Sequence, residues 1–162
     1  MTATEPQGGG GDASLADLAY THRDLTYPLG RRGPDPGELI AVTPHVGWAR
    51  LPVPGSLKHI NVWAVDDGDA GTAAGTGPVA LVDCGLNLAD SIAGWEALFA
   101  GPLAGRPVTR VICTHFHPDH IGLAGWLTRR FGVRLWMTRG EWLFARMLSL
   151  EASDTVPDEA VA

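Results

Sequence analysis

One short stretch constrains this chain more than any other: Thr114-His115-Phe116-His117-Pro118-Asp119-His120. It places three histidines and an aspartate within six positions. An apolar, β-branched run over residues 108–113 precedes it, and a run with helical spacing over residues 121–131 follows it. The stretch is therefore predicted to lie on a loop between a strand and a helix, where α/β folds place the residues that carry their chemistry.

The side chains of this stretch predict metal binding. On extended backbone, residues two apart point to the same side, so His115 and His117 can close on one ion. Neutral imidazole is a common zinc ligand. Pro118 then turns the chain, so Asp119 and His120 can face the same cavity and hold a second ion, about 3.5–4 Å from the first. The alternative is a histidine-rich surface loop with Asp119 as a helix cap, but capping needs only one polar residue.

These residues resemble the His-x-His-x-Asp-His motif of the metallo-β-lactamase fold superfamily. A second match is Leu81-Val82-Asp83-Cys84-Gly85, which is similar to the earlier strand-to-loop signature of that family, Asp-x-Gly. A looser match is the run 59–63, followed by an acidic turn, which resembles the second strand of the glyoxalase-II-like and thioesterase-like branch. The resemblance covers about residues 37–150. It implies an α+β or α/β fold that forms half of an αββα sandwich, a mixed sheet with helices on its outer face.

The resemblance also implies an activity, a cofactor and roles for single residues. It implies a metal-dependent hydrolase of thioesters, esters or lactones that uses a metal-bound hydroxide. One or two zinc ions are expected, with iron or manganese as alternatives, and the expected ligands are His115, His117, Asp119 and His120. Asp119 is also the expected catalytic residue, because it would orient the nucleophile. Asp83 is expected behind the metals as an acceptor for a ligating histidine, and the alternative is an aspartate that only turns the chain.

Counting ligands leaves both metal sites incomplete. A catalytic zinc usually takes three protein ligands, and this stretch supplies two for each ion. Members of the family add a later histidine to each ion and a later aspartate that bridges both. No histidine follows His120, and the later aspartates, Asp154 and Asp158, lie in a polar tail. We therefore expect the N-terminal half of a larger domain, and the alternative function is a catalytically incompetent or non-enzymatic module that binds metal weakly or needs a partner chain.

Composition limits the partners. The net charge of −6 and the pI of about 5.4 argue against a nucleic-acid binder, because neutralising phosphates needs a basic surface. No apolar run approaches the roughly 18 residues that a membrane-crossing helix needs, and the first residues lack the pattern of a secretory signal. We expect a cytoplasmic protein with a small-molecule substrate, no nucleic acid and no membrane, which forms an oligomer or lacks its C-terminal half. Cys84 and Cys113 are interpreted as reduced, packed thiols rather than as ligands or a bridge.

Three regions are expected along the chain. Residues 1–37 are predicted to be disordered or irregular. Within them, residues 1–13 are predicted to be disordered, because the run of glycines from Gly8 to Gly11 cannot bury enough surface to offset its ordering entropy. A short helix is possible at residues 14–20. Residues 38–150 form the metallo-β-lactamase-like half domain, and residues 151–162 form a polar tail.

Periodicity and end signals predict the elements of that domain. Strands are expected at residues 39–42, 47–51, 59–65, 78–83, 108–113 and 133–137, and helices at 87–100, 121–131 and 139–150. Asn87 is expected to cap the first helix and Gly132 to end the second. Thr138 and Glu141 are predicted to form a capping box for the third.

Overall fold

The computed structural model describes residues 19–30, 32–69 and 71–151, and the chain divides into two compact units after Gly33. The first unit contains an antiparallel hairpin of β1 (Tyr20–His22) and β2 (Leu25–Tyr27), in which the rings of Tyr20 and Tyr27 stack 4.8 Å apart. The disorder predicted for residues 1–13 lies outside the described residues. So do residues 14–18 of the predicted short helix, whereas Tyr20 belongs to a strand and not to a helix.

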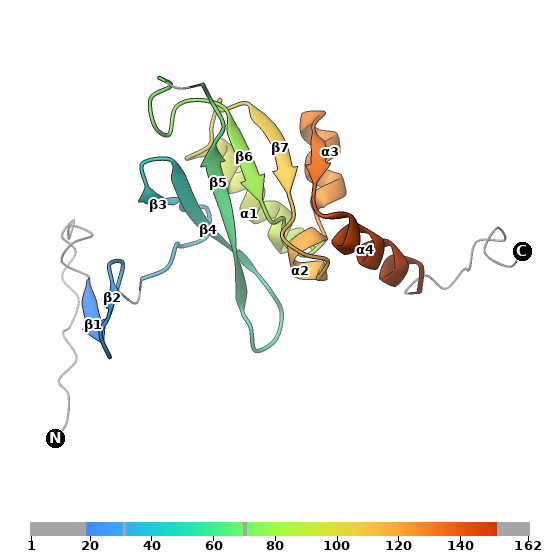
Figure 1. Cartoon of the computed structure of the whole chain (residues 1–162), viewed down its shortest axis with the longest axis horizontal. Helices are drawn as coiled ribbons and strands as arrows, with labels where there is room; N and C mark the ends of the chain where they lie inside the picture. Colours follow the sequence, from blue (N-terminus) through green and yellow to red (C-terminus); the bar gives the residue numbers. More distant parts are fainter. Residues whose placement is uncertain (1–18, 31, 70, 152–162) are drawn as a thin grey trace, which may run out of the picture. The chain divides into compact units, whose positions relative to one another are not determined.

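The second unit is built on a mixed six-stranded sheet in which each strand lies beside the next one in sequence (Figure 1). The strands are β3 (Ile40–Thr43), β4 (Val46–Pro52), β5 (His59–Asp66), β6 (Val79–Val82), β7 (Val108–Ile112) and β8 (Arg134–Trp136). Neighbouring strands from β3 to β6 are antiparallel, and β6, β7 and β8 are parallel. All six lie at the positions that the apolar runs predict.

Helices connect the parallel strands, as a parallel pairing requires. α1 (Ala89–Ala100) joins β6 to β7, whereas α2 (Pro118–Ile121) and α3 (Ala124–Phe131) join β7 to β8, and α4 (Arg139–Glu151) follows β8. None of the helices in the described part of the chain is long and apolar enough to cross a membrane.

The core lies between one face of the sheet and the helices α1 and α3. Trp95 and Leu98 of α1 and Leu127 of α3 are buried in the same cluster as Leu81 and Val111 of the sheet. Burying large apolar side chains is the main favourable term in folding, at about 1.5–3 kcal/mol each. A mixed sheet with helices packed on one face confirms the predicted fold class, an α+β or α/β layer with helices on its outer face.

Two predicted helix boundaries are wrong. α1 begins at Ala89 with Leu88 at its N-cap position, and no side chain caps it, so Asn87 does not have the predicted role. The helix predicted over residues 121–131 begins only at Ala124, as α3, and a separate short helix that was not predicted, α2, ends at Ile121, with Gly122 between the two. A Cβ atom on Gly122 would lie 2.8 Å from the backbone oxygen of Gly85, so the chain passes here directly against the loop that follows β6.

The other end signals are confirmed in whole or in part. Gly132 adopts a left-handed conformation with φ 65° and ends α3, as predicted. The hydroxyl of Thr138 accepts a hydrogen bond from the backbone N–H of Glu141 at 3.3 Å, which is half of the predicted capping box. The other half of the box is not formed, because the carboxylate of Glu141 accepts a hydrogen bond from the backbone N–H of Phe116 instead. The predicted polar tail starts at Glu151, the last residue of α4, and its remaining residues lie outside the described part of the chain.

Candidate metal centre

The loops that follow β6 and β7 meet at one edge of the sheet. Because the two strands are parallel neighbours, their carboxyl ends lie side by side, and the backbone N–H of Asp83 donates to the carbonyl of Ile112 at 2.8 Å. Asp83 follows β6 directly, and the histidine-rich stretch follows β7 and enters α2 at Pro118. Residues 114–117 therefore lie on a loop between a strand and a helix, as predicted, whereas Asp119 and His120 belong to the first turn of α2 and not to that loop.

The carboxylate of Asp83 joins these two loops. Asp83 is only 4% exposed, and its Oδ1 accepts a hydrogen bond from the backbone N–H of Thr114 at 2.8 Å. The Thr114 hydroxyl lies 3.0 Å from Oδ1 and 2.9 Å from Oδ2, and Nδ1 of His120 lies 2.8 Å from Oδ2. An ionised carboxylate can only accept, so His120 donates from Nδ1 and carries its lone pair on Nε2. Asp83 thus has the contacts expected of an acceptor behind a metal-ligating histidine.

His115 and His117 face each other in this loop. Nε2 of His115 lies 2.9 Å from Nδ1 of His117, and the two rings are nearly perpendicular, at 83°. The Thr114 hydroxyl lies 3.0 Å from Nδ1 of His115. Since Thr114 donates its one hydroxyl proton to Asp83, it accepts from His115, whose lone pair is then on Nε2 and directed toward His117.

Asp119 and His120 form a second pair beside the first. Oδ2 of Asp119 lies 3.5 Å from Nε2 of His120, the nitrogen that Asp83 leaves unprotonated. The ring centroids of His115 and His120 are 4.0 Å apart, so the two pairs are adjacent. The four side chains named from the sequence are therefore gathered at one place, although no three His, Cys, Asp or Glu side chains among the described residues form a group that could hold a metal ion.

The distances within each pair fit a shared cation. Two zinc ligands with bonds of about 2.0–2.1 Å in a tetrahedral arrangement have donor atoms about 3.3 Å apart. The observed separations of 2.9 Å for His115 and His117 and 3.5 Å for Asp119 and His120 lie on either side of that value. Small side-chain rotations would adapt either pair to a divalent metal. Each pair offers two donors, one fewer than a catalytic zinc usually has.

Two further residues fix the loop and were not singled out from the sequence. One is Thr114, whose hydroxyl links Asp83 to His115. The other is Glu141 in α4, whose carboxylate accepts a hydrogen bond from the backbone N–H of Phe116 at 2.8 Å. The rings of Phe116 and Phe144 lie 5.5 Å apart and add an apolar contact between the same loop and α4. The local sequence around Glu141 indicated only a helix cap, and no sequence signal pointed to a contact so distant along the chain.

The two cysteines pack beneath this loop. Cys84 and Cys113 are free thiols, 0% and 2% exposed, with their sulfur atoms 3.5 Å apart. The hydrogen bond with Cys113, together with burial, raises the pKa of the Cys84 thiol. The backbone N–H of Cys84 donates to the carbonyl of His120 at 2.8 Å. These contacts agree with the interpretation of both residues as packed thiols.

Comparison with known proteins places this arrangement in a family. The model of the metallo-beta-lactamase superfamily matches residues 56–157. A beta-lactamase domain protein from Burkholderia ambifaria has a similar structure, with 42% sequence identity and a TM-score of 0.69, over 76% of this chain and 38% of that one. A metallo-beta-lactamase family protein from Thermus thermophilus is 27% identical with a TM-score of 0.51, over 75% of this chain and 42% of that one.

The chain thus spans less than half the length of these two solved structures. A search of curated proteins found no match. The family model covers more than half of the chain, and it includes the whole histidine-rich stretch and Asp83. The chain belongs to the metallo-beta-lactamase superfamily.

Proposed function

We propose that this chain carries metal ligands of a metal-dependent hydrolase that acts on thioesters, esters or lactones. Superfamily membership suggests metal-dependent hydrolysis, and members typically bind zinc. The observation that supports the proposal most strongly is the gathering of two donor pairs, His115 with His117 and Asp119 with His120, at the carboxyl edge of the sheet. Open α/β sheets bind their ligands at this edge.

Each residue of the loop has a distinct part in the proposed reaction. His115 and His117 would hold one cation, and Asp119 and His120 would hold the other. Asp83 and Thr114 fix the rings of His120 and His115, so that the lone pairs stay directed at the metals. When bound, a divalent cation polarises the substrate carbonyl and makes a water molecule acidic enough to react near neutral pH.

Asp119 also orients the attacking water. Its carboxylate has two oxygens, and Oδ2 is the one that lies near His120. The other oxygen would accept a hydrogen bond from the water and would direct the water's lone pair at the carbonyl carbon. A positioned group of this kind contributes about 10²–10⁴-fold to a rate.

A thioester assay with matched variants tests this proposal. The 162-residue chain is loaded with zinc, and its hydrolysis of the thioester S-phenyl thioacetate is measured. His117→Ala is the test variant, and His22→Ala, in the β1–β2 hairpin, is the control. We expect hydrolysis above the rate of zinc alone, a loss of at least about 100-fold in His117→Ala, and no change in His22→Ala. Equal rates in wild type and His117→Ala would contradict the proposal.

The alternative is a non-catalytic module that binds metal weakly or acts together with a partner chain. It is supported by the count of donors, because neither pair reaches three ligands among the described residues. Metal content separates the two functions. Two retained zinc ions together with hydrolysis support the enzyme, whereas loosely bound zinc without hydrolysis of a thioester, an ester or a lactone supports the module.

A further inference from the structure

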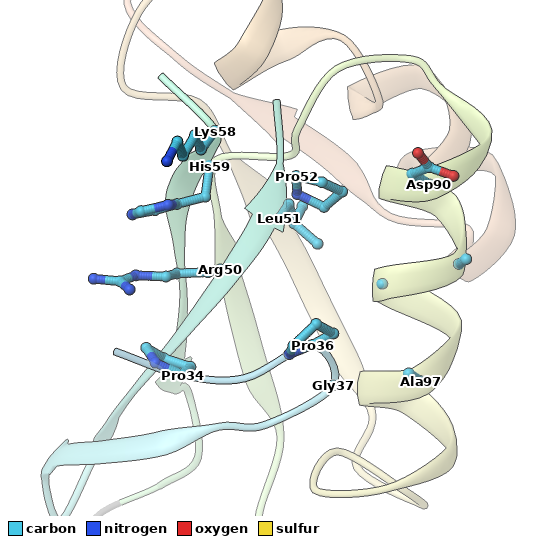
Figure 2. Close-up of a pocket in the computed structure, with 12 residues that line it drawn as sticks. Pro34, Pro36, Gly37, Arg50, Leu51, Pro52, Lys58, His59, Asp90 and Ala97 are labelled. Carbon is cyan, nitrogen blue, oxygen red and sulfur yellow. The ribbon is translucent and has the colours of Figure 1, made fainter. Parts of the chain in front are cut away.

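A second site lies at the free edge of β4, away from the histidine-rich loop. β3 pairs with β4 only as far as Trp48, so the edge of residues 49–52 is not covered by β3. A cavity of about 540 Å³ opens there between the segment 34–37, β4, the start of β5 and α1 (Figure 2). Its volume falls within the range of about 300–1,000 Å³ that is typical of small-molecule sites.

One wall of this cavity is cationic. In Figure 2, Arg50, Lys58 and His59 extend together on the side of β4 that faces away from α1, at the end of the cavity farthest from that helix. The sheet register explains why Arg50 and His59 share a face: Pro52 pairs with His59, and Arg50 stands two residues before Pro52. Among the described residues, no carboxylate forms an ion pair with Arg50 or Lys58. Burial, and then the charges of Arg50 and Lys58, lower the pKa of His59, which favours its neutral form, so the positive charge of this wall comes from Arg50 and Lys58.

The guanidinium of Arg50 has an unused donor. Its Cζ atom lies 4.7 Å from the centre of the Trp48 ring, which holds the side chain against the sheet. Its Nε is buried and has no hydrogen-bond partner among the described residues. Buried donors in proteins are nearly always paired, because leaving one unpaired is unfavourable. An acceptor oxygen that reached this N–H would satisfy it.

The opposite wall is apolar. Pro36, Leu51 and Ala97 line it, together with the exposed helix position Ala93. Asp90 is the acidic residue at this wall, and in Figure 2 it lies on the α1 side, across from the cationic residues. A ligand that fills the whole cavity therefore passes the uncovered edge of β4, with an acidic group on the side of Arg50 and a hydrocarbon part on the side of α1.

We propose that this cavity binds a small organic carboxylate, with its acid group held by Arg50, Lys58 and His59 and its hydrocarbon part against Pro36 and Ala97. The planar fork of a guanidinium matches the two oxygens of a carboxylate. None of these residues belongs to the donor pairs of the candidate metal centre, so the site does not depend on metal binding or hydrolysis.

Amide NMR of the 162-residue chain, without added metal, tests this site with hexanoate as the probe. Hexanamide has the same chain without charge, and acetate has the charge without the chain. We expect saturable shifts for hexanoate in residues 34–37, 50–52, 58–59 and 90–97. Binding of either control ligand should be weaker by about tenfold or more, or about 1.4 kcal/mol.

Two variants separate charge from shape. Arg50→Gln removes the guanidinium and should weaken hexanoate binding about tenfold, whereas Arg129→Gln, an exposed arginine of α3, should leave it unchanged. Ala93→Leu adds bulk at an exposed helix position and should block binding while the amide spectrum elsewhere stays that of the wild type. The proposal is overturned if hexanoate does not saturate below about 20 mM. It is also overturned if hexanamide binds as tightly as hexanoate, or if Arg50→Gln binds hexanoate as tightly as the wild type does. Shifts centred on the exposed apolar residues of α4 would overturn it as well.

Discussion

Oδ2 of Asp83 lies 2.8 Å from Nδ1 of His120, and this contact connects the end of β6 to the loop that follows β7. It determines which nitrogen of His120 is free to bind a metal. It also holds a buried carboxylate between two loops that would otherwise be joined mainly by backbone contacts. The first prediction follows from this relationship.

Replacing Asp83 with Asn should weaken zinc binding without unfolding the chain. Asn tolerates the left-handed conformation that Asp83 adopts at φ 61°, but an amide is a weaker acceptor for the His120 N–H. Outer contacts of this kind are worth about 10–100-fold in metal affinity. Competition with a chelator measures the change, and Asp69→Asn, at an exposed position in the loop after β5, is the control. Equal zinc affinity in wild type and Asp83→Asn would contradict a role of Asp83 in metal binding and would favour the alternative that it only turns the chain.

Replacing Gly122 with Ala should destabilise the chain. An added Cβ would lie 2.5 Å from the Pro118 carbonyl oxygen and 2.8 Å from both the Asn87 nitrogen and the Gly85 oxygen, and backbone atoms cannot move aside cheaply. We expect a loss of about 1–3 kcal/mol in the free energy of unfolding, measured with urea. Gly140→Ala in α4, where nothing lies within 4 Å, is the matched control. It should stabilise by about 0.5–1 kcal/mol, and a Gly122→Ala chain as stable as the wild type would show that the two loops are not in close contact.

Replacing Glu141 with Ala should loosen the loop between His115 and His117. The carboxylate accepts the hydrogen bond of the Phe116 backbone N–H, and a hydrogen bond to a charged group contributes about 1.5–3 kcal/mol. Hydrogen exchange of the Phe116 amide should therefore become at least about tenfold faster. Glu96→Ala, which removes an exposed ion pair with Arg130, should leave that amide unchanged. An unaltered exchange rate in Glu141→Ala would count against the contact.

Asp66 should contribute to stability above its pKa and lose that contribution in acid. The backbone N–H of Gly75, and then the side chains of His45 and Arg106, hold the pKa of Asp66 below its ordinary value, against the opposing effect of burial. The unfolded chain therefore takes up this proton at a higher pH than the folded chain does. The difference in unfolding free energy between wild type and Asp66→Asn should have its maximum value above about pH 5. It should decrease as the pH falls toward about 2. A difference that does not vary with pH would contradict this assignment.

Local sequence patterns predicted the strands well because each apolar run is bounded by turn residues. The carboxyl-edge position of the histidines followed from one strand and one helix that flank them. The break between α2 and α3 could not be predicted, since it depends on Gly122 packing against the loop after β6, far away in sequence. The same reason explains Glu141, whose pattern indicated a cap but whose carboxylate binds Phe116.

The cavity at the edge of β4 depends even more on tertiary structure. Arg50 and His59 share a face only because of the register between β4 and β5. The sequence does contain the arginine and the histidine, but nothing local indicates that the segment 34–37 and α1 enclose the space beside them. The donor pairs, in contrast, lie within six consecutive residues, over one loop and the first turn of α2, and could be proposed from spacing alone.

Nitrogen NMR of the histidine rings during a zinc titration tests metal binding by the histidine-rich stretch most directly. The predicted result is a selective change in Nε2 of His115, Nδ1 of His117 and Nε2 of His120, with Nδ1 of His120 still protonated by its hydrogen bond to Asp83. The rings of His22, His45 and His59 should not change. Shifts confined to those three rings, or no shift in any ring at saturating zinc, would contradict the assignment of the ligands.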